Sequence, residues 1–116
     1  MQFSTFSTEN RARCESEEGF AHKLDDWDMN KWMVAACGEL GEAANKMKKL
    51  NRVGETKKFN KGKTEEQLMG DLLLELGDAV IYIDLLAQRL GFDLEYVVRA
   101  AFNQKSIEIG CSHYLV

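Results

Sequence analysis

The chain has 116 residues, no proline and a formal net charge of −4. This length is typical of one domain, and a chain this short buries only about two-thirds of its unfolded surface, so it gains much by associating with copies of itself. The composition excludes a disordered tail, a collagen-like chain and a disulfide-stapled mini-protein, and the acidic balance argues against binding of a nucleic-acid polymer.

Long stretches of helically spaced apolar residues without proline predict an all-α fold. The N-terminal segment, 1–23, holds a short helix over about Thr8–Glu18 that Ser7 caps. Acids at 25, 26 and 28 begin a second helix, which runs to about Leu50.

The third helix begins at a capping box formed by Thr64 and Gln67 and ends near Gly91. Asp93 caps a fourth helix over about Leu94–Ile109, which Gly110 ends. We expect the two long helices to pack antiparallel in a single four-helix-bundle-like domain over 1–116.

Three cysteines, Cys14, Cys37 and Cys111, form no CxxC pair, so we expect reduced thiols in a cytoplasmic protein. The N-terminus lacks the cationic and apolar regions of a signal peptide, and no apolar run approaches the roughly 18 residues of a membrane span. We therefore expect no membrane partner.

A basic segment connects the two long helices. Between 46 and 63 there are eight basic residues, and Glu55 is the only acid. A solvated surface loop at 51–63 is about as good an interpretation of this run as a functional one. The basic residues are Lys46, Lys48, Lys49, Arg52, Lys57, Lys58, Lys61 and Lys63.

Each long helix carries a pair of acids among apolar residues. Glu39 and Glu42 lie in GELGEAAN, and Glu75 and Asp78 lie in LELGDAVIY. The i, i+3 spacing puts each pair on one helix face, and packed helices would bring the four together. One such pair alone is a common solvated pattern, but two in apolar helices predict a partly buried site.

Four neighbouring carboxylates repel one another unless a cation neutralises them. Oxygen ligands favour a hard cation, so we expect Mg²⁺, with Mn²⁺ as a substitute. A di-iron site is disfavoured, because neither histidine forms a Glu-x-x-His pair with these acids.

Residues near the acids suit a phosphorylated ligand. Lys46 and Lys49 extend the helix of the first pair and could neutralise phosphate charge. Trp27 and Trp32 could stack on a base, although core packing is the slightly favoured interpretation of Trp32. Tyr82, one turn beyond Asp78, could direct its hydroxyl into the same cleft.

The order of ExxE, loop, ExxD and LGFDLEYVVRAAFNQKS resembles the MazG-like all-α nucleoside triphosphate pyrophosphohydrolases of phages and bacteria, over about Trp27 to Gly110. The most specific parts are GELGEAANKMKKL and LELGDAVIYIDLLAQRLGFDLE. The resemblance implies a MazG-type fold and hydrolysis of a (deoxy)nucleoside triphosphate to the monophosphate and pyrophosphate. It implies Mg²⁺ held by the four acids, and Glu39 or Glu42 orienting or deprotonating the attacking water.

The resemblance also implies a homodimer or homotetramer in the cytosol of a bacterium or of a phage-infected host. Many relatives carry a phosphate-binding lysine near the position of Ala101 and Phe102, so Asn103 and Lys105 are the candidates for that role here. Base preference stays open. The alternatives are an enzyme related to phosphoribosyl-ATP pyrophosphohydrolase and a helical interaction module without catalysis.

Overall fold

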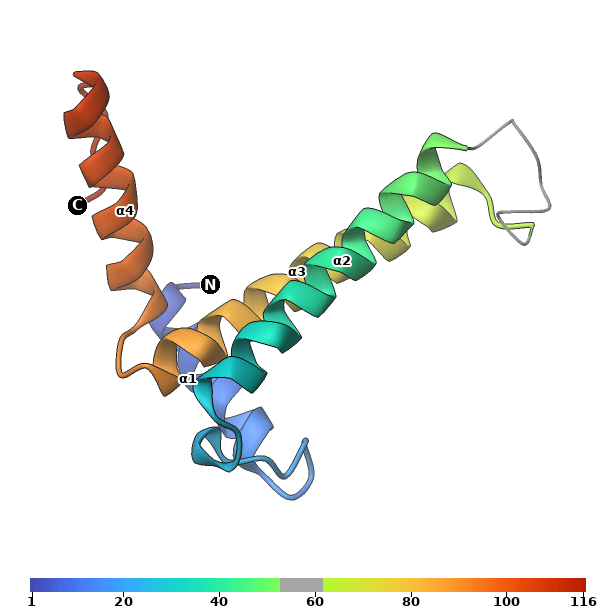
Figure 1. Cartoon of the computed structure of the whole chain (residues 1–116), viewed down its shortest axis with the longest axis horizontal. Helices are drawn as coiled ribbons and strands as arrows, with labels where there is room; N and C mark the ends of the chain where they lie inside the picture. Colours follow the sequence, from blue (N-terminus) through green and yellow to red (C-terminus); the bar gives the residue numbers. More distant parts are fainter. Residues whose placement is uncertain (53–61) are drawn as a thin grey trace. The chain divides into compact units, whose positions relative to one another are not determined.

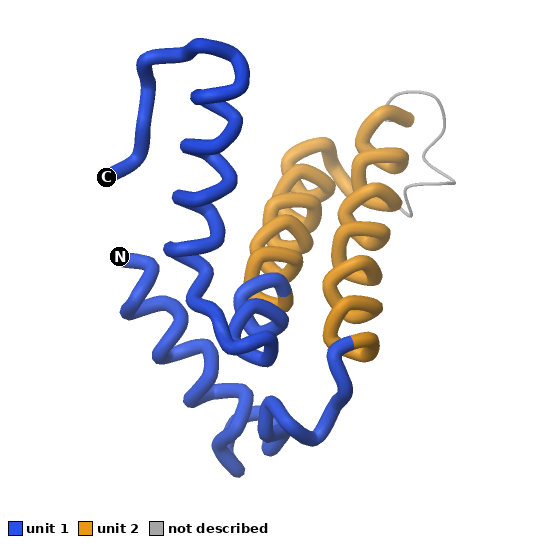
Figure 2. Tube along the Cα trace, turned by 60° about the vertical axis from the view of Figure 1, so that its left-hand side comes forward, with its two compact units in different colours: residues 1–29, 83–116 blue, residues 30–82 orange. Residues whose placement is uncertain are grey.

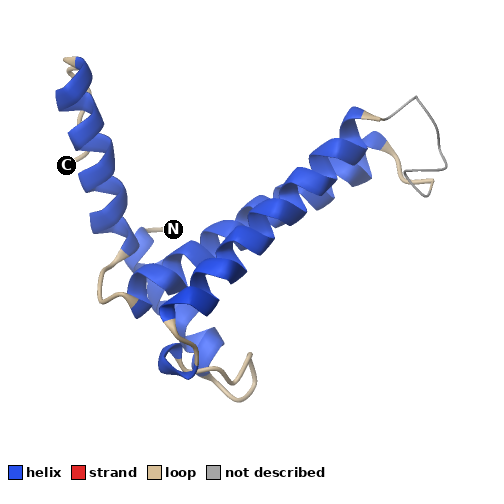
Figure 3. Ribbon diagram, in the orientation of Figure 1, coloured by secondary structure: helices blue, strands red, loops and turns tan. Residues whose placement is uncertain are grey.

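The computed structural model describes residues 1–52 and 62–116, and every regular element within them is helical (Figures 1 and 3). The all-α prediction is therefore confirmed for this part of the chain. Most of the predicted basic loop, 51–63, lies outside it, including Lys57, Lys58 and Lys61. The elements are α1 (Phe3–Glu15), η1 (Leu24–Asp26), α2 (Met29–Asn51), α3 (Glu65–Arg89) and α4 (Leu94–Ile109).

The chain divides into two compact units (Figure 2). The terminal unit comprises Met1–Met29 and Ile83–Val116, and the hairpin unit comprises Asn30–Tyr82. In the terminal unit α1 contacts α4 and η1. The hairpin unit consists of α2 and the larger part of α3, which run side by side in opposite directions (Figures 1 and 2). The antiparallel packing predicted for the two long helices is thus confirmed.

Helix α1 differs from its prediction, because it spans Phe3–Glu15 rather than 8–18. Ser7 is not its cap: it lies within the helix, and its hydroxyl donates a hydrogen bond to Asp84, 2.5 Å away. After α1 the chain folds back so closely that a Cβ on Gly19 would lie 1.9 Å from the carbonyl oxygen of Arg13. Only glycine fits this turn, and it ends the helix earlier than the sequence pattern suggests.

The predicted start of the second helix is wrong, because Asp25 and Asp26 lie in the separate 3-10 turn η1 and α2 begins only at Met29. The predicted ends of α3 and α4 are confirmed. Thr64 Oγ1 accepts from the backbone of Gln67 at 3.2 Å, and Gln67 Oε1 accepts from the backbone of Thr64 at 3.0 Å, as in a capping box. Asp93 accepts from the backbone of Tyr96 at 2.7 Å. Gly110 ends α4 in the left-handed conformation, with φ 68°.

The α2–α3 hairpin is held by a seam of residues that recur at alternating spacings of three and four. Such a pattern is typical of two helices packed with a heptad repeat. The rings of Trp32 and Tyr82 lie 6.3 Å apart and set the register. The buried members of the seam are Trp32, Ala36 and Ala43 from α2 and Leu68, Leu72 and Ala79 from α3.

The terminal unit has its own buried side chains. Cys14, Leu24, Leu85 and Leu94 supply apolar area, and Asp84 is a fully buried carboxylate. All three cysteines are free thiols, as predicted. Among the described residues we find no helix of the length and apolar character that crossing a membrane requires.

Candidate metal centre

The hairpin register places two glutamates opposite each other in the seam. Seven residues along α2 from Trp32 is Glu39, and seven residues back along α3 from Tyr82 is Glu75. Asp78, one turn from Glu75, completes the group. One carboxylate oxygen from each of the three acids lies within 4.8 Å of the others. Seam positions are normally apolar, so acids here cost stability unless something else compensates them.

The surroundings of Glu39 disfavour its charged form. Glu39 and Glu75 are half-buried, and Asp78 is exposed. Burial raises the pKa of Glu39 above its usual value, and a hydrogen bond with Glu75 and the charges of the neighbouring acids raise it further. Among the described residues these three form the group whose donors could hold a metal ion.

The donor set fits a hard divalent cation. All three side chains offer carboxylate oxygens, which Mg²⁺ and Mn²⁺ prefer over softer ligands. A cation bound between them would remove the repulsion that raises the pKa of Glu39. Because Asp78 faces solvent, such an ion would keep positions open for water or for phosphate oxygens.

The fourth predicted ligand, Glu42, lies beside the cluster rather than within it. Its side chain is exposed, and it does not belong to the group within 4.8 Å. It is nevertheless close enough for its charge to raise the pKa of Glu39. The structure therefore brings three of the four predicted acids together and leaves Glu42 as a free neighbouring carboxylate.

Lys46 and Lys49 lie farther along the same hairpin. Both are half-buried, while Lys48 between them is exposed. They approach Asp71 of α3, and Lys63 forms an ion pair with the same carboxylate at 2.6 Å. Sequence reasoning missed Asp71. The available signal was its position seven residues before Asp78, which puts both acids on one face of α3.

The aromatic candidates occupy different environments. Trp32 is only 2% exposed and packs against Tyr82, so the core-packing interpretation is confirmed for Trp32. Tyr82 is half-buried in the hairpin unit. Trp27 belongs to the terminal unit, where its ring lies 4.9 Å from the ring of His22 and its carbonyl accepts from Arg89.

Asn103 and Lys105 are both engaged within the terminal unit. The side-chain amide of Asn103 donates to the carbonyl of Leu115 at 2.8 Å and accepts from its backbone N–H at 2.7 Å. It thereby holds the C-terminal tail against α4. Lys105 pairs with Glu108 at 2.7 Å. These contacts give both residues a local partner in the terminal unit.

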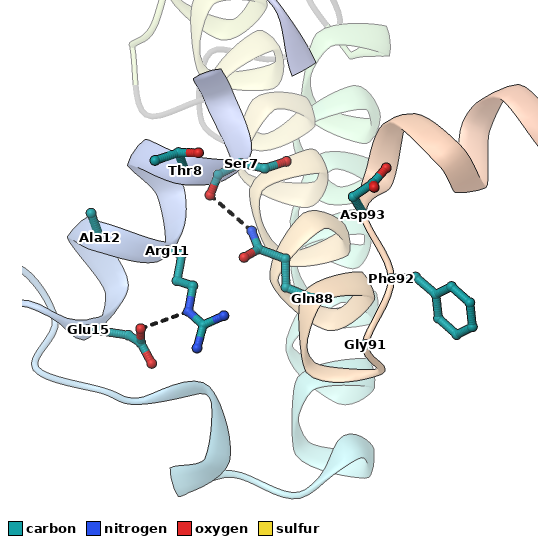
Figure 4. A pocket seen from close by; sticks show the side chains of 9 residues that line it. All are labelled: Ser7, Thr8, Arg11, Ala12, Glu15, Gln88, Gly91, Phe92 and Asp93. Atoms are coloured by element: carbon teal, nitrogen blue, oxygen red, sulfur yellow. Dashed lines mark hydrogen bonds and ion pairs between the residues drawn. The ribbon is translucent and has the colours of Figure 1, made fainter. Parts of the chain in front are cut away.

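A hollow of about 630 Å³ in the terminal unit lies between α1 and the turn that joins α3 to α4 (Figure 4). Its cation, Arg11, is already paired with Glu15 at 2.8 Å. Gln88 donates across it to the carbonyl of Ser7 at 3.0 Å. None of the predicted site residues lines this hollow, and the pairing of Arg11 leaves it without a free charge for an anion.

Sequence reasoning also missed Asp84, which is 0% exposed. Its oxygens accept from the side chains of Ser7, Asn10 and Gln88 at 2.5, 2.8 and 2.9 Å. An acid within the apolar run IYIDLLA was the available signal. The three donors make Asp84 an anchor for α1.

Comparisons of the chain with known protein families, with curated proteins and with solved structures find no match. The resemblance to the MazG-like enzymes therefore rests on the sequence motifs themselves.

Proposed function

We propose that the protein is a Mg²⁺-dependent pyrophosphohydrolase of MazG type that cleaves a (deoxy)nucleoside triphosphate to the monophosphate and pyrophosphate. One observation carries this proposal: Glu39, Glu75 and Asp78 converge within 4.8 Å at the seam of two otherwise apolar helices. The resemblance of the motifs around these acids supplies the reaction and the substrate class.

The four acids have two roles in this proposal, metal binding and activation of the attacking water. Glu39, Glu75 and Asp78 would hold the metal, because their oxygens already converge. Glu42 is left outside this group and exposed, so its carboxylate is the one free to orient the attacking water and accept its proton. When bound, Mg²⁺ supplies positive charge at the phosphate oxygens and at the leaving pyrophosphate.

The hairpin offers an apolar surface that suits self-association. Large side chains on both helices are exposed, among them Val34, Leu40, Leu73 and Leu74. Two helices share only one seam, so these residues have no place in it. We propose a homodimer or homotetramer in which copies of the hairpin cover one another. Sedimentation equilibrium over a concentration series tests this, and a monomer at all concentrations would contradict it.

The central experiment is a nucleotide panel with identification of products. Purified protein with Mg²⁺ should release pyrophosphate and a nucleoside monophosphate from at least one triphosphate. Absence of pyrophosphate with every nucleotide, with either Mg²⁺ or Mn²⁺, would refute the proposal and leave a helical interaction module as the alternative.

Variants separate the two roles of the acids. Glu42→Gln should lower kcat by more than about 100-fold and leave Mg²⁺ affinity, measured by calorimetry, within about threefold of wild type. Glu75→Gln should lower Mg²⁺ affinity itself. Glu66→Gln, at the exposed start of α3, is the matched control and should change neither. A fully active Glu42→Gln enzyme would remove Glu42 from the reaction.

A further inference from the structure

Asp71 forms an ion pair with one lysine toward the loop end of the α2–α3 hairpin, and two further lysines at the end of α2 act on it by their charge. Lys63 Nζ lies 2.6 Å from Asp71 Oδ2. Lys46 and Lys49 come from the last turns of α2 and are half-buried, unlike Lys48. The hydrogen bond from Lys63, together with the charges of the three lysines, holds the pKa of Asp71 below its usual value. Asp71 is thus an anion held within a cationic cluster.

This cluster and the metal centre lie on the same hairpin face. Lys46 follows Glu39 by seven residues on α2, and Asp71 precedes Asp78 by seven residues on α3. Seven residues correspond to about 10 Å along a helix. A lysine side chain that reaches back one turn brings its ammonium group to within about 5 Å, along the helix axis, of the level of the acids. A polyphosphate chain that extends from the metal centre along the hairpin would bridge this gap.

The charge of the three lysines favours binding of a phosphate group over the carboxylate of Asp71. Three ammonium groups and one carboxylate leave a net charge of +2 in the cluster. An outer phosphate carries more negative charge than Asp71 and offers three acceptor oxygens. The side chains of Lys63 and Asp71 are 46% and 31% exposed, so a ligand can reach this ion pair without moving the helices.

We propose that Lys46, Lys49 and Lys63 form the subsite for the outer phosphates of the substrate, and that Asp71 occupies this subsite until the phosphates displace it. The identity of the substrate rests on the proposed function. Asp71 then acts as an internal competitor, and removing its charge strengthens binding.

The test is calorimetric titration of the full chain with tripolyphosphate in EDTA, where no turnover occurs. Asp71→Asn should bind tripolyphosphate about fivefold more tightly than wild type, because the competing carboxylate is gone. The double variant Lys46→Gln/Lys49→Gln should bind it at least about tenfold more weakly. Lys48→Gln removes the same charge from the exposed position and should stay within about twofold of wild type.

Two results would overturn the proposal. One is unchanged or weaker binding by Asp71→Asn with a wild-type melting curve in circular dichroism. The other is that Lys48→Gln loses as much affinity for tripolyphosphate as the double variant loses for each lysine replaced. That result would mean that tripolyphosphate is attracted by surface charge in general. If Asp71→Asn does not fold, the comparison of the lysine variants decides.

The outcome is independent of catalysis. A protein that binds tripolyphosphate with this pattern but hydrolyses no nucleotide would keep the subsite and lose the proposed activity. A protein that hydrolyses nucleotides but shows neither the Asp71 effect nor the lysine effect would keep the activity and lose the subsite.

Discussion

Helix α3 carries the acid pair Glu75 and Asp78 and, six residues after Asp78, the single acid Asp84. The surroundings of the pair and of the single acid are opposite in kind. Asp84 is completely buried, yet three neutral side chains donate hydrogen bonds to its two oxygens. Glu75 and Asp78 are less buried, and they face a third acid, Glu39. The more deeply buried acid is the one whose hydrogen-bonding needs are met.

This difference separates an anchor from a candidate binding site. The chain itself completes the environment of Asp84, so it needs no ligand and serves to fix α1. The cluster of Glu39, Glu75 and Asp78 consists only of acids, so a cation from outside the chain would offset their repulsion, as the proposed function requires. The proposal of a functional site therefore rests on the partly buried acids that face one another and not on the most deeply buried acid.

The largest expected effect is the loss of activity in Asp78→Asn. Replacing one charged oxygen of the three weakens the hold on the metal and with it the stabilisation of charge at phosphorus. We expect kcat/KM to fall by about 1000-fold, measured by pyrophosphate release. The melting temperature in EDTA should not fall, because this acid has no donor within the cluster. Activity above one-tenth of wild type would remove Asp78 from the site.

Asp84→Ala should have the converse effect. It removes an acceptor that the side chains of Ser7, Asn10 and Gln88 share, so the free energy of unfolding should fall by about 2 kcal/mol. Urea denaturation measures this loss. The shift in stability on adding Mg²⁺ should remain, because this acid is not part of the metal centre. Thr8→Ala, at an exposed neighbouring position on α1, is the control.

How far sequence predicts the fold depends on how local the deciding interaction is. The ends at Thr64, Asp93 and Gly110 follow from residues three or fewer positions away, and they were predicted correctly. Ser7 looked like a similar cap. Its hydroxyl is instead used by Asp84, 77 residues along the chain, and no local pattern contains that information.

The same reasoning applies to the site. Helical spacing and antiparallel packing predicted that all four acids would face one another, and Glu39, Glu75 and Asp78 do converge. Helical spacing could not tell which member of the Glu39 and Glu42 pair enters the seam, since i, i+3 spacing only puts both on one side. Asp71 was missed because its three lysines come from α2 and from the end of the loop, so none precedes or follows it within a turn.

Glu39→Gln should move stability in opposite directions with and without metal. In EDTA the variant loses repulsion between acids, so its melting temperature should rise by about 4 °C, which corresponds to about 1 kcal/mol in a small domain. With Mg²⁺ the wild type should gain stability and the variant should not. Differential scanning fluorimetry measures both. Glu42→Gln changes an acid outside the converging group, so this variant should still gain stability with Mg²⁺. If Glu42→Gln fails to gain stability, as Glu39→Gln does, the two acids do not differ in their role.

The smallest effect is the pH dependence of this repulsion. Because the pKa of Glu39 is raised in the folded state, the folded protein binds more protons than the unfolded one above the usual value of 4.5. Stability in EDTA should therefore be highest, as far as this group contributes, below that pH and fall as pH rises through the raised pKa. Asp71 and Glu108 have lowered pKa values and act in the opposite sense at lower pH. Asp71 and Glu108 are present in both wild type and Glu39→Gln. Subtracting the melting temperature of Glu39→Gln from that of wild type at each pH therefore isolates the contribution of Glu39. The measurement runs from about pH 4 to about pH 8, which covers the titration of a glutamate with a raised pKa. If the difference in melting temperature between wild type and Glu39→Gln stays constant over this range, the acids do not repel in the folded protein and the argument for a cation between them fails.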